Sequence, residues 1–63
     1  MEKERVHKAI VAAGGIGRLA TGLKVKYQSI QRWTRVPAER VLDIERITGV
    51  SRSELRPDLY PIE

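Results

Sequence analysis

Several residue types that carry chemistry are missing or scarce in this sequence of 63 residues. There is no cysteine, so the chain can form no disulfide, thiolate metal site or cysteine nucleophile. The one histidine, His7, cannot complete a metal cluster or a catalytic triad alone, and we interpret it as a helix surface residue. No nucleophile–base pair is visible, and Gly14, Gly15 and Gly17 indicate a helix break rather than a phosphate-binding loop. We therefore predict that the protein is not an enzyme and has no metal, cofactor or small-molecule ligand.

Long hydrophobic runs are also absent. No apolar run approaches the length of a membrane span, and the charged N-terminal residues do not resemble a secretory signal. We expect a soluble protein of a reducing cytoplasm, without a membrane partner. The length predicts one domain, residues 1–63, near the lower limit of chains that fold without staples.

Acidic residues are absent from one continuous part of the chain. Residues 14–36 contain five cations and no acid, whereas the rest carries seven cations and all eight acids, a net charge of −1. The five cations are Arg18, Lys24, Lys26, Arg32 and Arg35. A basic surface on a near-neutral body is typical of proteins that bind polyanions. The alternative is that charges cluster by chance in so short a chain. Four arginines sit among acids and are predicted mainly to form surface ion pairs, with Arg52 alone a candidate for phosphate contact: Arg40, Arg46, Arg52 and Arg56.

The apolar residues recur at helical spacing, which predicts an all-α fold of five short helices. The first stripe consists of Val6, Ala9, Ile10 and Ala13, and Gly14-Gly15 ends that helix. The second consists of Ile16, Leu19, Ala20 and Leu23. Period-2 alternation and the Asn-Gly or Asp-Gly turns of hairpins are missing, so no strand is expected.

Three further helices are expected in the second half of the chain. After a break at residues 24–26, a helix over residues 27–34 directs Ile30 and Trp33 to the core. Pro37 begins a fourth helix with a wide apolar band, which Gly49 closes. The segment "SRSE" at residues 51–54 fits a capping box that starts a fifth helix. Residues 57–63 are predicted to form an extended tail, with Leu59 and Tyr60 laid back on the body.

The second and third expected helices, over residues 16–34, have the proportions of a helix-turn-helix. In that motif the second helix lies in the major groove and the first crosses the DNA backbone. Ala20 is small where the two helices approach each other, and Val25 and Ile30 are apolar where they fill the angle between them.

The segment "IGRLATGLKVKYQSIQRW" resembles the helix-turn-helix of the Cro and repressor proteins of lambdoid phages. The segment "VPAERVLDIERITGVSRSELRPDLYP" is similar to the C-terminal half of the all-helical branch of the Cro family. The resemblance implies a lambda-repressor-like DNA-binding domain encoded by a phage or prophage. It also implies a sequence-specific repressor that reads an inverted-repeat operator in double-stranded DNA. Such a protein would be associated with the nucleoid in the cytoplasm of a bacterial host cell.

The resemblance places the base-reading positions near the start and middle of the third helix. They are Lys26, Tyr27, Gln28, Gln31 and Arg32. A glutamine amide can pair with adenine N6 and N7, and an arginine with guanine O6 and N7. Phosphate contacts are expected from Arg18, Lys24 and Arg35. Alternatively, Tyr27 only covers the junction between the two helices, and Arg18 and Lys24 are ordinary solvated charges.

Two positions depart from the family pattern. Lys24 stands in the turn where the family usually has glycine, and a left-handed lysine there would cost roughly 1–2 kcal/mol. Ile16 stands where the family often has a glutamine that contacts phosphate. Backbone amides at the helix N-terminus would then have to make that contact.

A second copy of the chain is expected, because one short helix reads too few base pairs for useful specificity. The candidate dimer surface consists of Leu55, Leu59 and Tyr60, together with the apolar band of the fourth helix. We predict a weak homodimer that is completed on DNA. The alternative is that these residues close the core of a monomer.

Two other functions remain open at this point. The first is an antitoxin-like regulator with the same DNA chemistry. The second is a small basic module that binds an acidic protein partner. Binding to single-stranded nucleic acid is less consistent with only three aromatic residues, because such binders use several rings as stacking platforms.

Overall fold

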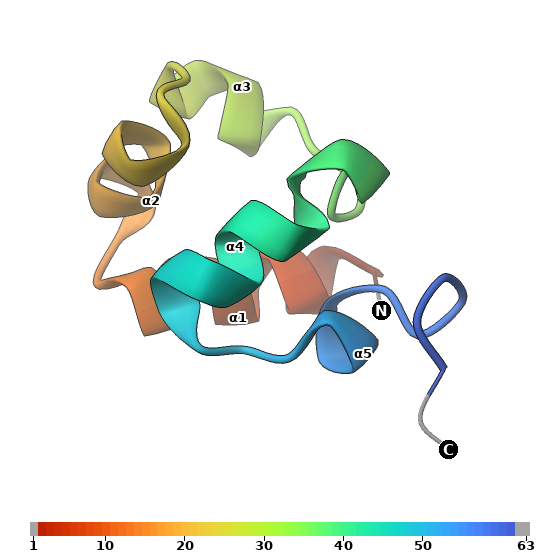
Figure 1. The fold of residues 1–63 in the computed structure, drawn as a ribbon. Coiled ribbons are helices and arrows are strands. Elements are labelled where there is room, and N and C mark those ends of the chain that lie inside the picture. Colours follow the sequence, from red (N-terminus) through yellow and green to blue (C-terminus); the bar gives the residue numbers. More distant parts are fainter. Residues whose placement is uncertain (1, 62–63) are drawn as a thin grey trace.

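The computed structural model describes residues 2–61 and confirms the all-helical prediction. Its elements are α1 (Glu2–Ala13), α2 (Ile16–Leu23), α3 (Tyr27–Gln31), a 3-10 turn η1 (Ala38–Arg40), α4 (Val41–Thr48) and α5 (Arg52–Leu55). Helices α1, α2 and α4 contact one another, and α5 packs on α1 and α4. Figure 1 shows α2 and α3 at one side of the molecule and α5, with the residues that follow it, at the other.

The core is assembled from the apolar stripes that the sequence displays. Its buried members are Val6, Ala9, Leu19, Ala20, Leu23, Ile30, Val36, Val41, Ile44 and Leu55. Each stripe supplies residues three or four apart, which lie on one face of a helix. Burial of apolar area is the main stabilising term for helices as short as these, since their intrinsic helical stability is marginal.

Two glycines connect α1 to α2. Gly14 and Gly15 have φ angles of 93° and 127°, in the range that side-chain-bearing residues rarely adopt. The Gly15 N–H donates to the carbonyl of Ile10 at 2.9 Å, which closes the end of α1 as expected.

Gly22 lets α2 and α4 approach closely. A Cβ atom at this position would lie 2.9 Å from the Cδ1 atom of Ile47. The missing side chain thus lets the second helix lie against the fourth.

Helix boundaries differ from the sequence predictions in two places. Helix α3 ends at Gln31, three residues before the predicted end at Thr34, although Trp33 still packs against the core. The expected fourth helix begins as the 3-10 turn η1, and its apolar band is only partly buried. Leu42 is 50 % exposed because it lies on the outer face of α4.

The capping box before α5 is half formed. The Ser51 hydroxyl accepts a hydrogen bond from the N–H of Glu54 at 3.2 Å, as predicted. The Glu54 carboxylate instead lies 2.6 Å from the ammonium group of Lys8, which ties α5 to α1.

The C-terminal residues require three corrections. The chain is not extended after α5 but folds back in a turn at residues 57–59. The N–H groups of Leu59 and Tyr60 both donate to the carbonyl of Arg56. Leu55 is only 1 % exposed and belongs to the core, so the prediction that it forms a dimer surface is wrong. Leu59 is 45 % exposed and is not laid on the body as predicted, whereas Tyr60 packs against the core. Residues 62 and 63 of the predicted tail lie outside the described residues.

Arg56 is buried, although the sequence suggests a surface ion pair. It is 6 % exposed, because its guanidinium group lies beneath the C-terminal turn. The group donates to the carbonyl of Val36 at 2.9 Å and to both carboxylate oxygens of Asp58 at 3.0 and 2.7 Å. A buried cation with a bidentate carboxylate partner and a carbonyl acceptor has its donors satisfied.

Candidate nucleic-acid interface

The turn between α2 and α3 has the left-handed residue that the resemblance implies. Lys24 adopts φ 60° and ψ 41°, and it is the one non-glycine residue with positive φ among residues 2–61. The N–H of Val25 donates to the carbonyl of Ala20 at 3.0 Å across this residue. This is the pattern of a Schellman cap, in which glycine normally holds the left-handed position.

Helix α3 is attached to the body by one buried side chain. Ile30 is fully buried, and Val25 from the preceding turn packs beside the core. Most of the surface of α3 is therefore available to a partner.

The five predicted base-reading residues, Lys26, Tyr27, Gln28, Gln31 and Arg32, are all exposed on α3 or directly beside its ends. Tyr27 is 47 % exposed, so its ring is no core residue, although part of it covers the helix junction. The structure thus brings these donors and acceptors together on one short element.

Of the predicted phosphate-contacting residues, Lys24 and Arg35 lie before and after α3 in the chain, and Arg18 lies in α2. Arg18, Lys24 and Arg35 are all exposed. The Arg18 side chain lies over Gly14, since its Cδ atom would be 3.0 Å from a Cβ there. Its guanidinium group is therefore held near the start of α2.

Cations inside and outside residues 14–36 differ in whether they form salt bridges. Among the described residues, no salt bridge engages any of the five cations of this segment. By contrast, Lys8 pairs with Glu54, Arg46 with Asp43 at 3.0 Å, and Arg52 with Glu45 at 2.9 Å. The pairing predicted for Arg46 and Arg52 is confirmed. Residues 14–36 therefore present positive charge that no salt bridge among the described residues neutralises.

Two carboxylates outside this segment have lowered pKa values. Hydrogen bonds from Arg56 lower the pKa of Asp58 from 3.8 to about 2, and the positive charge of Arg35 acts in the same direction. The N–H and guanidinium of Arg52 lower the pKa of Glu45. Both acids are therefore ionised at neutral pH, and each holds an arginine.

Two cations that the sequence patterns did not single out for this region contact the backbone that follows α3. The ammonium group of Lys3 donates to the carbonyl of Trp33 at 2.9 Å and to that of Gln31 at 3.4 Å. Arg56 holds the carbonyl of Val36 from the other end of the chain. No local sequence signal points to Lys3, because its acceptors are backbone atoms 28 and 30 residues away.

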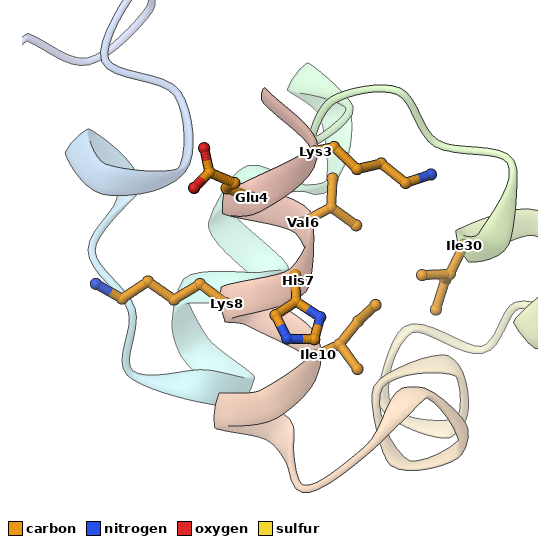
Figure 2. A pocket seen from close by; sticks show the side chains of 7 residues that line it. All are labelled: Lys3, Glu4, Val6, His7, Lys8, Ile10 and Ile30. Atoms are coloured by element: carbon orange, nitrogen blue, oxygen red, sulfur yellow. The ribbon is translucent and has the colours of Figure 1, made fainter. Parts of the chain in front are cut away.

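A groove of about 530 Å³ runs beside α1 on the side that faces α3. Its floor is apolar, with Val6, Ile10 and Ile30, and His7 lies exposed at its edge as predicted. In Figure 2 the Lys3 side chain extends from α1 toward the α3 side of the groove.

Residues 2–61 contain no group of three or more histidine or acidic side chains that could hold a metal ion. Within the same residues no helix has the length and apolar character needed to cross a membrane.

The fold and the site define a small all-helical domain compatible with the helix-turn-helix type, with an acid-free basic side. The chain belongs to the family described as Bacterial toxin YdaS, whose family model matches residues 6–62. The match includes both the helix-turn-helix segment and the C-terminal segment that resembles Cro proteins. No curated protein and no solved structure gave a significant match.

Proposed function

We propose that this protein is a Cro-type transcriptional repressor that binds double-stranded DNA in a sequence-specific manner. The observation that carries the proposal is the exposed α3 with its base-reading side chains, within a segment of five cations and no acid. Placed in the major groove, α3 would present amides and cations without carboxylates that repel phosphates. Repression would follow from occupation of an operator and exclusion of polymerase.

The base-reading work is assigned first to Gln28 and Arg32. The exposed amide of Gln28 suits a bidentate pair with adenine, and Arg32 suits guanine. Gln31 precedes Arg32 and shares this work, while Tyr27 offers an edge to a thymine methyl group. Lys26, the N-cap residue of α3, lies where the helix would meet the groove edge.

Arg18, Lys24 and Arg35 are assigned to phosphates. Each neutralised phosphate makes the logarithm of the binding constant fall by about 0.9 per logarithm of salt concentration. Three such contacts per subunit would therefore give a slope near −3 for each half-site. Substitution of one of them should weaken binding to all sequences alike and reduce the slope by about one.

A second copy of the chain would supply the other half-site, roughly 34 Å away along the DNA. Leu59 is exposed and Tyr60 is half-buried, so both remain available for this contact, and Leu42 adds a third apolar side chain on α4. With Leu55 in the core the apolar surface is small, which supports a dimer that is weak without DNA.

Selection from a random pool of duplex DNA at near-physiological salt tests the proposal. An enriched inverted repeat is the expected result, and it should be lost for the Gln28→Ala variant at one base position per half-site. A short unpaired motif would replace the dimer with a monomer that reads DNA alone. Binding without any enrichment would refute sequence reading and favour a module that binds an acidic protein partner through the same side.

The family description favours a second candidate, a growth-inhibiting protein or a regulator within a toxin–antitoxin pair. Induced expression of the wild type and of Gln28→Ala in a bacterial host separates the two roles. Growth arrest that disappears with Gln28→Ala would mean that inhibition acts through DNA reading. Arrest that persists at equal protein level would assign inhibition to another surface.

A further inference from the structure

The recognition helix is held at its C-terminal end by a residue from the other end of the chain. Lys3, in the first turn of α1, directs its ammonium group to the carbonyls of Trp33 and Gln31 at 2.9 and 3.4 Å. Figure 2 shows this side chain reaching across from α1 on the side where Ile30 marks α3.

The position of this cation suits the needs of a short helix. The last carbonyls of any helix lack internal donors, and α3 has only five residues. The Lys3 ammonium supplies such a donor to the Gln31 carbonyl, the last of α3, and holds more closely the Trp33 carbonyl, two residues beyond the helix. Its charge also interacts favourably with the negative end of the helix dipole. Since five residues cannot sustain a helix alone, a contact from outside strongly affects where its end lies.

The rest of the exit segment is held in the same way. Further along this segment, the Val36 carbonyl accepts a hydrogen bond from the side chain of the buried Arg56. Residues 31–36 are therefore fixed by cations from both ends of the chain, while Ile30 anchors the helix from below. Of the two cations, Lys3 is the exposed one, so its substitution spares the core.

We propose that Lys3 is a positioning residue of the DNA-reading helix, acting through the carbonyls of Gln31 and Trp33 rather than by contact with DNA. The inference rests on the proposed function, because it takes α3 as the reading element. It goes beyond that function by extending the determinants of DNA affinity to a residue outside the helix-turn-helix.

The first experiment needs no DNA. The Trp33 N–H donates to the Ile30 carbonyl at 3.1 Å, so its exchange with solvent deuterium reports opening of the end of α3. Lys3→Met should speed this exchange about 2- to 5-fold, the effect of one helix-terminal cation, and Lys3→Arg should restore the wild-type rate. Lys8→Met is the matched control, because Lys8 lies on the same helix but pairs with Glu54 in α5. Equal exchange of Trp33 in Lys3→Met and the wild type would overturn the proposal.

The second experiment measures binding to the selected operator over a range of salt concentrations. Lys3→Met should bind about 2- to 5-fold more weakly with an unchanged salt slope, since no phosphate contact is lost. A slope reduced by about 0.9 would overturn the positioning role in favour of a direct phosphate contact. If the wild type binds its operator and Lys3→Met binds it with the same affinity, the positioning role is overturned as well. A wild type without sequence preference would instead refute the proposed function, and the exchange experiment would still decide whether Lys3 holds α3.

Discussion

Lys24 should limit the stability of the fold, and Lys24→Gly tests this directly. The residue holds φ 60° and ψ 41°, a conformation that costs a side-chain-bearing residue about 1–2 kcal/mol. Glycine removes this strain but has a more flexible unfolded state, which offsets about 0.5–1 kcal/mol. The expected net gain is about 0.5–1 kcal/mol in the free energy of unfolding. For a chain of this length that corresponds to a rise in Tm of roughly 2–8 °C.

Thermal and urea unfolding followed by far-ultraviolet circular dichroism measure this gain. Lys24→Ala is the matched control for charge, because it removes the ammonium group and keeps the strained backbone. Arg18→Gly is the control for glycine itself, since the exposed Arg18 lies inside α2, where glycine should cost about 0.5–1 kcal/mol. A Tm of Lys24→Gly equal to or below that of the wild type would refute the reasoning, because strain would then contribute nothing.

Three further predictions concern single side chains. Gln28→Ala should lower the preference for one base by about 1–3 kcal/mol in a competition assay and leave non-specific binding unchanged; a uniform loss across sequences would contradict base reading. Leu55→Ala should destabilise the fold by about 2–5 kcal/mol in urea, whereas Leu59→Ser should leave Tm unchanged and weaken operator binding; equal Tm losses would contradict the assigned burial. The pKa of Asp58 is lowered to about 2, so its ion pair with Arg56 stabilises the fold above pH 4 and is lost as pH falls from 4 to 2. Asp58→Asn should flatten the acid limb of a stability–pH curve in that window, and an unchanged limb would mean that other carboxylates control it.

The helices that the sequence predicted correctly are those with local signals. Gly14-Gly15 and Ser51 are end signals that act within a few residues, and both function as expected. The left-handed conformation of Lys24 was suggested only by the resemblance, because the family usually has glycine at this position. Periodicity alone could locate α2, because its four apolar residues all fall on one face of a helix and so define the face that is buried.

The features that the sequence did not reveal depend on contacts between distant residues. The burial of Arg56 could not be foreseen, since it depends on the Val36 carbonyl 20 residues away. The contact at the end of α3 is of the same kind, since the carbonyls of Gln31 and Trp33 accept from Lys3, which lies 28 and 30 residues away. Leu55 was misplaced because a helix of four residues is too short to show which of its faces is buried.

Residues 31–36 are held by Lys3 and Arg56, which come from distant parts of the chain. The proposed reading helix α3 therefore depends on the rest of the domain for its structure. An excised peptide of residues 14–36 would keep every candidate DNA-contacting side chain but lose Lys3, Arg56 and the body on which Ile30 packs. Such a peptide should show the circular dichroism of a coil, and a stable helix in it would contradict this view. Because these contacts close over 20 to 30 residues, α3 should also be among the last elements to order as the chain folds. The terminal residues, which carry no base-reading role, would thus decide when the protein becomes competent to bind.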